Sequence, residues 1–162
     1  MPSKPISYFF AILLFAVLLL IESYLHPYFT SLFFINWLII FIIFINFNFP
    51  FIFVFPLALI SALFFDSLTF NYWGVNFGLF LLVIIFQKLL LKIFEKNSYL
   101  SWLIVGELLI IFYFLGLTLS YLILKQPIFY QNIFLSLVLN ALIYWLILQI
   151  YNPKIYKKKL TL

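Results

Sequence analysis

The sequence contains no cysteine and no arginine, and histidine occurs only once. Without cysteine, the chain cannot form disulfides, use a thiolate nucleophile, or hold an iron–sulfur cluster or a cysteine zinc site. The single histidine, His26, excludes a metal site built from several histidines of this chain. We therefore expect neither a metal nor a cofactor.

Charged side chains are also scarce. They make up 8% of the 162 residues, against roughly 25% in an average soluble domain. Hydrophobic residues make up 68%, and the apolar runs recur along the whole chain, which a signal peptide or a single anchor cannot explain. We expect an all-α integral membrane protein that forms one transmembrane domain over residues 1–162.

Six apolar stretches are candidates for helices that cross a bilayer, which takes about 20 residues. Polar turns and prolines separate the stretches, beginning with His26-Pro27. The third stretch is the shortest and contains Pro56, so a re-entrant segment is the alternative for it. The predicted spans are residues 6–25, 28–45, 50–65, 74–91, 99–124 and 128–151.

The lysines indicate how these spans are oriented. With six crossings, the N-terminus, the 46–49 turn, the 92–98 loop and the tail share one side of the membrane, and only Lys125 lies on the other. Lysine accumulates on the cytoplasmic side, so both termini are expected in the cytoplasm. The positive charge then serves topology, and no nucleic-acid partner is expected. The lysines on the shared side are Lys4, Lys88, Lys92, Lys96, Lys154, Lys157, Lys158 and Lys159.

Ionisable groups inside a membrane are costly and suggest a function. Glu107 lies about 12 Å from the cytoplasmic end of the fifth span. Asn140, in the sixth span, is expected at the same depth and close to it. Two interpretations of Glu107 and Asn140 are open: they join helices by hydrogen bonds, or they have a role in transport or in a relay. Asn140 belongs to a row spaced by four residues on one helix face: Asn132, Ser136, Asn140 and Tyr144.

Other charged residues lie near span ends. The outer side collects Glu22, His26, Asp66 and Lys125, which are either solvated interface groups or part of a partner or ligand site. The lysine-rich tail favours contact with anionic lipid. No nucleophile–base set, zinc-protease motif or phosphate-binding glycine loop occurs, so an enzyme is not expected.

One segment carries a family resemblance. The apolar run Ala58–Phe65 ends at Asp66, seven residues intervene, and Gly74 opens the next apolar run. This order resembles the MreD family of bacterial rod shape-determining membrane proteins, whose members share such a segment and a similar length and number of spans. Asn36-Trp37 is similar to a further position of that family, although Ile35 stands where the family has proline.

The resemblance implies a non-enzymatic scaffold subunit of the cell-elongation machinery, which lays lateral peptidoglycan, in the bacterial cytoplasmic (inner) membrane. The implied partners are an MreC-like bitopic membrane protein, the glycosyltransferase RodA, a transpeptidase and the actin-like MreB. The loop between the third and fourth spans would face the periplasm as a partner or ligand face, with Asp66, Asn71, Tyr72, Trp73, Gly74 and Asn76.

Substrate-binding subunits of energy-coupling-factor vitamin transporters are the alternative, because they are also small six-span proteins. Such a subunit needs an outer pocket lined by polar and aromatic groups, and the same loop region could supply them. The fourth and fifth spans lack an evident row of small residues for docking a coupling subunit, which favours the scaffold.

Overall fold

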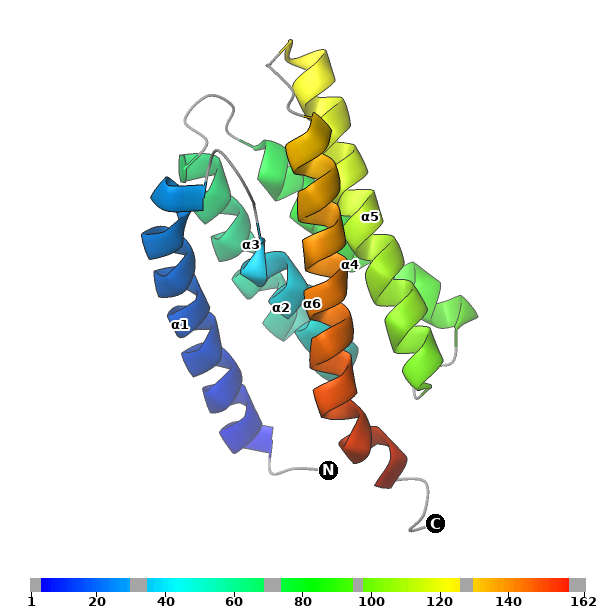
Figure 1. Cartoon of the computed structure of the whole chain (residues 1–162). Helices are drawn as coiled ribbons and strands as arrows, with labels where there is room; N and C mark the ends of the chain where they lie inside the picture. Colours follow the sequence, from blue (N-terminus) through cyan, green and yellow to red (C-terminus); the bar gives the residue numbers. More distant parts are fainter. Residues whose placement is uncertain (1–3, 30–34, 69–73, 95–97, 126–129, 158–162) are drawn as a thin grey trace.

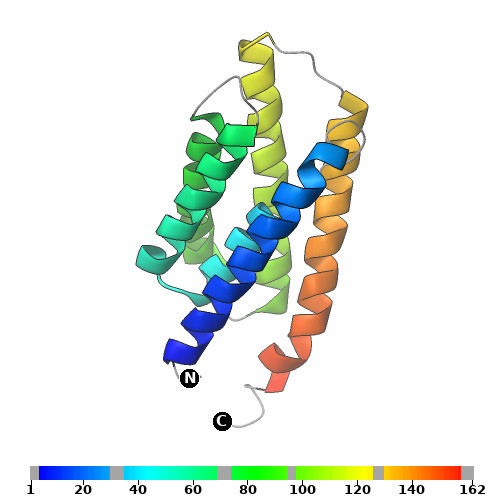
Figure 2. The same ribbon diagram turned by 90° about the vertical axis from the view of Figure 1, so that its left-hand side faces the viewer.

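The computed structural model describes residues 4–29, 35–68, 74–94, 98–125 and 130–157, and these ranges contain helices and no strand. Successive helices run in opposite directions along the bundle (Figure 1). Figure 2 shows that the start of α1, the end of α6 and the α2–α3 junction lie at the same end of the bundle. The helices are α1 (Lys4–Phe29), α2 (Trp37–Asn48), α3 (Phe51–Leu68), α4 (Val75–Ile93), α5 (Tyr99–Ile123) and α6 (Tyr130–Lys157).

Helix α2 is the shortest helix and lies at the centre of the bundle. Its 12 residues rise only about 18 Å, which is less than the roughly 30 Å of a bilayer core. It packs against each of the other five helices. Its side chains are buried over most of its length, at Leu38, Ile39, Ile40, Phe41, Ile42, Ile43, Ile45, Asn46 and Phe47.

The second predicted span is therefore wrong in both its start and its end. The helix begins at Trp37 instead of residue 28, and it continues through Asn46, which we expected in a polar turn, to Asn48. An unbroken apolar run indicates burial, but it does not reveal where the backbone enters a helix. The third stretch, expected to be short, forms the 18 residues of α3, with Pro56 inside the helix.

Two prolines that lie just beyond predicted spans do not end the helices that contain them. Helix α1 continues past Pro27 to Phe29, and α6 continues past Pro153 to Lys157. A proline removes one backbone hydrogen bond, and a helix that is held by its other bonds can continue beyond it. Helices α4 and α5 begin and end within two residues of the predicted bounds.

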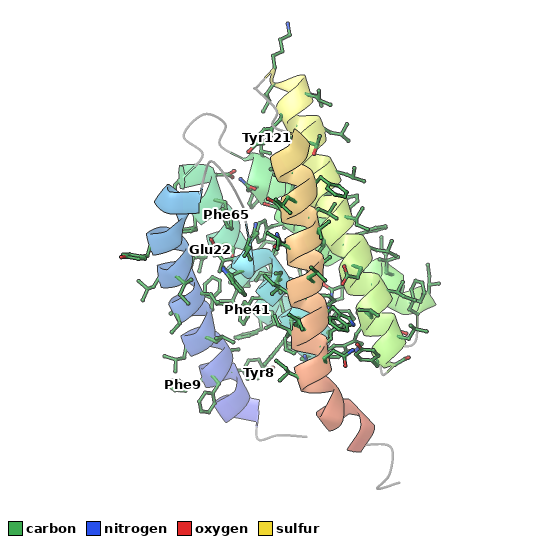
Figure 3. All side chains as sticks on the ribbon, viewed as in Figure 1. Tyr8, Phe9, Glu22, Phe41, Phe65 and Tyr121 are labelled. Atoms are coloured by element: carbon green, nitrogen blue, oxygen red, sulfur yellow. The ribbon has the colours of Figure 1, made fainter. Side chains whose placement is uncertain are left out.

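Apolar side chains fill the core and also cover the outside of the bundle. In the core, Phe47 stacks on Trp102 with ring centroids 4.4 Å apart. On the outside, Phe9, Leu20 and Leu119 are 64%, 70% and 58% exposed. In the view of Figure 3, side chains project outward from α1 on one side of the bundle and from α5 on the other. Helices that are apolar on both faces are typical of proteins surrounded by lipid.

Three helices in the described part of the chain are long and apolar enough to cross a membrane. Their candidate spans are Val75–Ile93, Tyr99–Ile123 and Ile133–Ile150. Shorter apolar helices cover Tyr8–Tyr24, Trp37–Asn48 and Phe51–Ser67. The molecule is thus an all-helical bundle with an apolar exterior.

Candidate functional site

The first turn of α2 is capped in the interior of the bundle. Asn36 is the N-cap residue, and its side-chain oxygen accepts a hydrogen bond from the backbone N–H of Ile39 at 2.8 Å. The backbone N–H of Asn36 donates to Oδ1 of Asn140 at 3.0 Å, and its Nδ2 donates to the Tyr113 hydroxyl at 3.0 Å. One asparagine thus starts the helix and joins α2 to α5 and α6.

A buried carboxylate completes this cap. Oε1 of Glu22 accepts a hydrogen bond from the backbone N–H of Trp37 at 2.7 Å, and the Glu22 side chain is 3% exposed. Figure 3 shows Glu22 on α1 at the level where α2 begins. The positive end of a helix dipole stabilises a carboxylate placed there. Glu22 is therefore buried in the bundle. It is not a solvated interface group, which was one of the interpretations that we considered for this residue.

Asp66 caps the N-terminal end of α4 in the same way. Gly74 precedes that helix with a left-handed φ of 100° and has no side chain with which to cap it. Oδ2 of Asp66 accepts from the backbone N–H groups of Gly74 and Phe77 at 2.9 and 3.3 Å. Oδ1 accepts from the backbone N–H and the Nδ2 of Asn76 at 2.9 and 3.2 Å. The aspartate and glycine of the predicted loop therefore hold α3 to α4.

Tyr113 joins these two caps. Its hydroxyl donates to Oδ1 of Asn76 at 3.0 Å while it accepts from Nδ2 of Asn36 at 3.0 Å. Five residues therefore form one hydrogen-bonded series that crosses α3, α4, α5, α2 and α6, with the last link made by the backbone N–H of Asn36: Asp66, Asn76, Tyr113, Asn36 and Asn140. We call this series the polar chain. All five residues are at most 4% exposed.

Sequence reasoning missed Tyr113 as a site residue. It is a tyrosine inside an apolar helix, and Gly106 lies two turns before it on the same buried face of α5. A hydroxyl on a face that is otherwise apolar must find a partner when it is buried. That rule would have singled out Tyr113, but its two partners come from other helices and could not have been named.

Three residues of the row predicted on the sixth span lie on the buried face of α6. Nδ2 of Asn140 donates to the backbone oxygen of Ser136 at 2.7 Å. The hydroxyl of Tyr144 donates to the backbone oxygen of Trp102 at 2.8 Å. The Tyr144 ring lies directly over Gly106, where an added Cβ would collide with it. Ser136, Asn140 and Tyr144 are at most 3% exposed.

The remaining predicted site residues have different outcomes. The side chain of Asn132 lies outside the described residues, as do Asn71, Tyr72 and Trp73. Glu107 is half-buried on α5. Its proximity to Asn140 stays a prediction, since the hydrogen bonds described above for the Asn140 amide go to Asn36 and Ser136.

Helix α4 holds the other end of α2. Nε2 of Gln87 donates to the backbone oxygen of Ile43 at 2.9 Å, and its Oε1 accepts from Nδ2 of Asn46 at 2.9 Å. The ammonium group of Lys88 donates to the backbone oxygen of Asn46 at 2.9 Å. A cation at the C-terminal end complements the helix dipole. The carboxyl group of Glu22 and the ammonium group of Lys88 therefore hold the two ends of α2.

Comparison of the chain with models of known families, with curated proteins and with solved structures gave no match. Among the described residues, no three His, Asp or Glu side chains are grouped so that they could hold a metal ion. The polar chain and the two clamped ends of α2 are therefore the features on which a functional proposal rests.

Proposed function

We propose that the protein is an integral membrane protein whose six helices lie in a bilayer with both termini in the cytoplasm. The apolar exterior supports this placement, because a soluble protein rarely exposes continuous apolar surface over its helices. The lysines support the orientation. Lys88 and Lys92 lie in the last two turns of α4, at the end of the bundle where α1 starts and α6 ends.

The short helix α2 is compatible with a bilayer because it is enclosed. Backbone that leaves a helix at membrane depth is tolerated only where protein or a water-filled cavity surrounds it. The backbone N–H groups of Asn36, Trp37 and Ile39 all donate to side chains of this chain. Three backbone donors at this helix start are therefore satisfied within the protein and not by solvent.

Within the membrane, the chain acts as a non-enzymatic scaffold subunit of the cell-elongation machinery that lays lateral peptidoglycan. The observation that supports this role is that Asp66 caps the start of α4. The residues that carry the resemblance to MreD proteins, Asp66 and Gly74, are engaged in capping α4 and are linked to Asn76 and the polar chain. Asp66 and Gly74 thereby help to determine how the helices are arranged. A protein that acts by holding partners needs such a defined arrangement.

The partner set follows from the resemblance. It comprises an MreC-like bitopic protein, RodA, a transpeptidase and the actin-like MreB. The alternative, a substrate-binding subunit of a vitamin transporter, would use Asp66 and Asn76 as ligand groups. Both oxygens of Asp66 already accept hydrogen bonds from α4, and one of them accepts from the Asn76 side chain, which favours the scaffold.

Affinity purification from native membranes, followed by mass spectrometry, tests the choice. The scaffold predicts recovery of a bitopic partner with a periplasmic coiled coil, and it predicts that rod-shaped cells become round when the protein is depleted. Recovery of an ATPase and a coupling subunit together with a bound vitamin, or unchanged rods that require a vitamin, would overturn it in favour of the transporter.

A further inference from the structure

Glu107 differs from the other carboxyl groups described in the bundle. Glu22 and Asp66 each accept hydrogen bonds from the backbone of a helix start. Within the described part of the chain, the carboxyl group of Glu107 makes neither a hydrogen bond nor an ion pair. The residue is also only half-buried, so part of Glu107 is exposed on the surface of the bundle.

The surface around Glu107 is apolar. Leu100, Leu108 and Ile111 of the same helix are 60%, 41% and 39% exposed. The hydroxyl of Tyr144, on the neighbouring helix α6, donates to the backbone oxygen of Trp102 and not to Glu107. A single carboxyl group therefore stands in a largely aliphatic surface, and no basic side chain among the described residues pairs with it.

The position of Glu107 along α5 makes this arrangement costly in a bilayer. Eight residues separate it from Tyr99, where α5 begins, a distance of about 12 Å along the helix. With the end of α5 at the membrane surface, Glu107 lies within the hydrocarbon. A carboxyl group at that depth is expensive unless it has a partner.

We propose that Glu107 and the apolar residues Leu100, Leu108 and Ile111 form a docking surface for a membrane-spanning helix of another protein that carries a lysine or arginine at the same depth. Charge complementarity selects this occupant over lipid, whose acyl chains cover the leucines equally well but leave the carboxyl group unpaired. The low dielectric of the hydrocarbon strengthens the ion pair. The inference rests on the membrane placement proposed above and is independent of which machinery the partner belongs to.

Designed single-span peptides in lipid vesicles provide the test. Three otherwise identical leucine–alanine helices carry lysine, glutamine or leucine about 12 Å from one end. The chain has no cysteine, so Lys125→Cys gives one site for a donor dye, and energy transfer to a labelled peptide reports binding. The lysine peptide should bind at least about tenfold more tightly than the leucine peptide. The interaction energy of a close charge pair at an interface exceeds the free energy that corresponds to a tenfold change in affinity.

Two variants locate the effect. Glu107→Gln keeps the shape of the side chain and should bind all three peptides alike, with an unchanged thermal unfolding temperature as the check on folding. The double variant Glu107→Leu with Leu115→Glu moves the carboxyl group about 12 Å along the exposed side of α5. It should prefer a peptide whose lysine is displaced by the same distance.

Equal binding of the lysine and leucine peptides by the unaltered protein would overturn the proposal, as would a lysine preference that survives in Glu107→Gln. The vesicles contain no elongation proteins. A peptide result of either sign therefore leaves the cell-shape experiment unaffected, and failure of the cell-shape experiment leaves the docking surface standing.

Discussion

At the scale of single residues, the bundle is organised by polar side chains that satisfy one another. Asp66, Asn76, Tyr113, Asn36 and Asn140 form a continuous series of hydrogen bonds through an apolar interior. A buried polar group costs free energy when it lacks a partner, so each member of the series specifies where its neighbours must lie. The polar chain therefore gives the bundle one arrangement of its helices.

Replacing Tyr113 with phenylalanine tests the centre of the polar chain. The change removes the hydroxyl that accepts from Asn36 and donates to Asn76. We expect the free energy of unfolding in mixed micelles to fall by about 1–2 kcal/mol. Tyr121→Phe is the matched control on the same helix, because the Tyr121 hydroxyl makes no hydrogen bond within the described residues. Equal effects of the two changes would contradict the role of Tyr113.

Asp66 is tested by removing its carboxylate. Asp66→Ala takes four hydrogen bonds from the first turn of α4 and should lower the free energy of unfolding by about 2 kcal/mol. Asp66→Asn keeps one acceptor oxygen and should cost less. The control is Ser67→Ala, at an exposed residue whose hydroxyl bonds only within its own helix. A loss no larger than that of Ser67→Ala would show that Asp66 does not hold α4.

At the scale of helices, the sequence predicted most elements and missed one start. Apolar runs located α4 and α5 within two residues because polar residues or glycine bound both runs. The start of α2 could not be predicted, because residues 32–45 are apolar with Asn36 as a lone polar exception. At this start the backbone N–H of Asn36 donates to Asn140, more than a hundred positions away. Such a partner is defined only once the chain has folded.

The close contact between α5 and α6 is tested at Gly106. An alanine there would push its Cβ into the Tyr144 ring, which the hydrogen bond to Trp102 holds in place. We expect Gly106→Ala to cost about 1–3 kcal/mol of unfolding free energy. Gly78→Ala is the control, because an added Cβ at this position in α4 meets no atom within 4 Å. It should be neutral or stabilise its helix by up to about 1 kcal/mol. Equal losses at the two glycines would contradict the packing.

At the scale of the whole molecule, a short central helix is enclosed by five others. Helix α2 contacts all of them, and Glu22 and Lys88 hold its two ends. The bundle presents mostly apolar side chains to its surroundings, with Glu107 as a half-buried exception. A buried, hydrogen-bonded interior and an apolar exterior suit the proposed role of holding partners within a membrane.

The central claim, a bundle that lies in the membrane with both ends in the cytoplasm, is tested most directly by labelling single cysteines in intact cells. The cysteine-free chain allows one cysteine at a time, at the exposed positions Ser67 and Lys125 of one bundle end or Asn48 and Lys92 of the other. A maleimide that cannot cross the inner membrane should label positions 67 and 125 in intact cells, and positions 48 and 92 only after the membrane is opened. Labelling of all four positions in intact cells, or of 48 and 92 alone, would contradict the account.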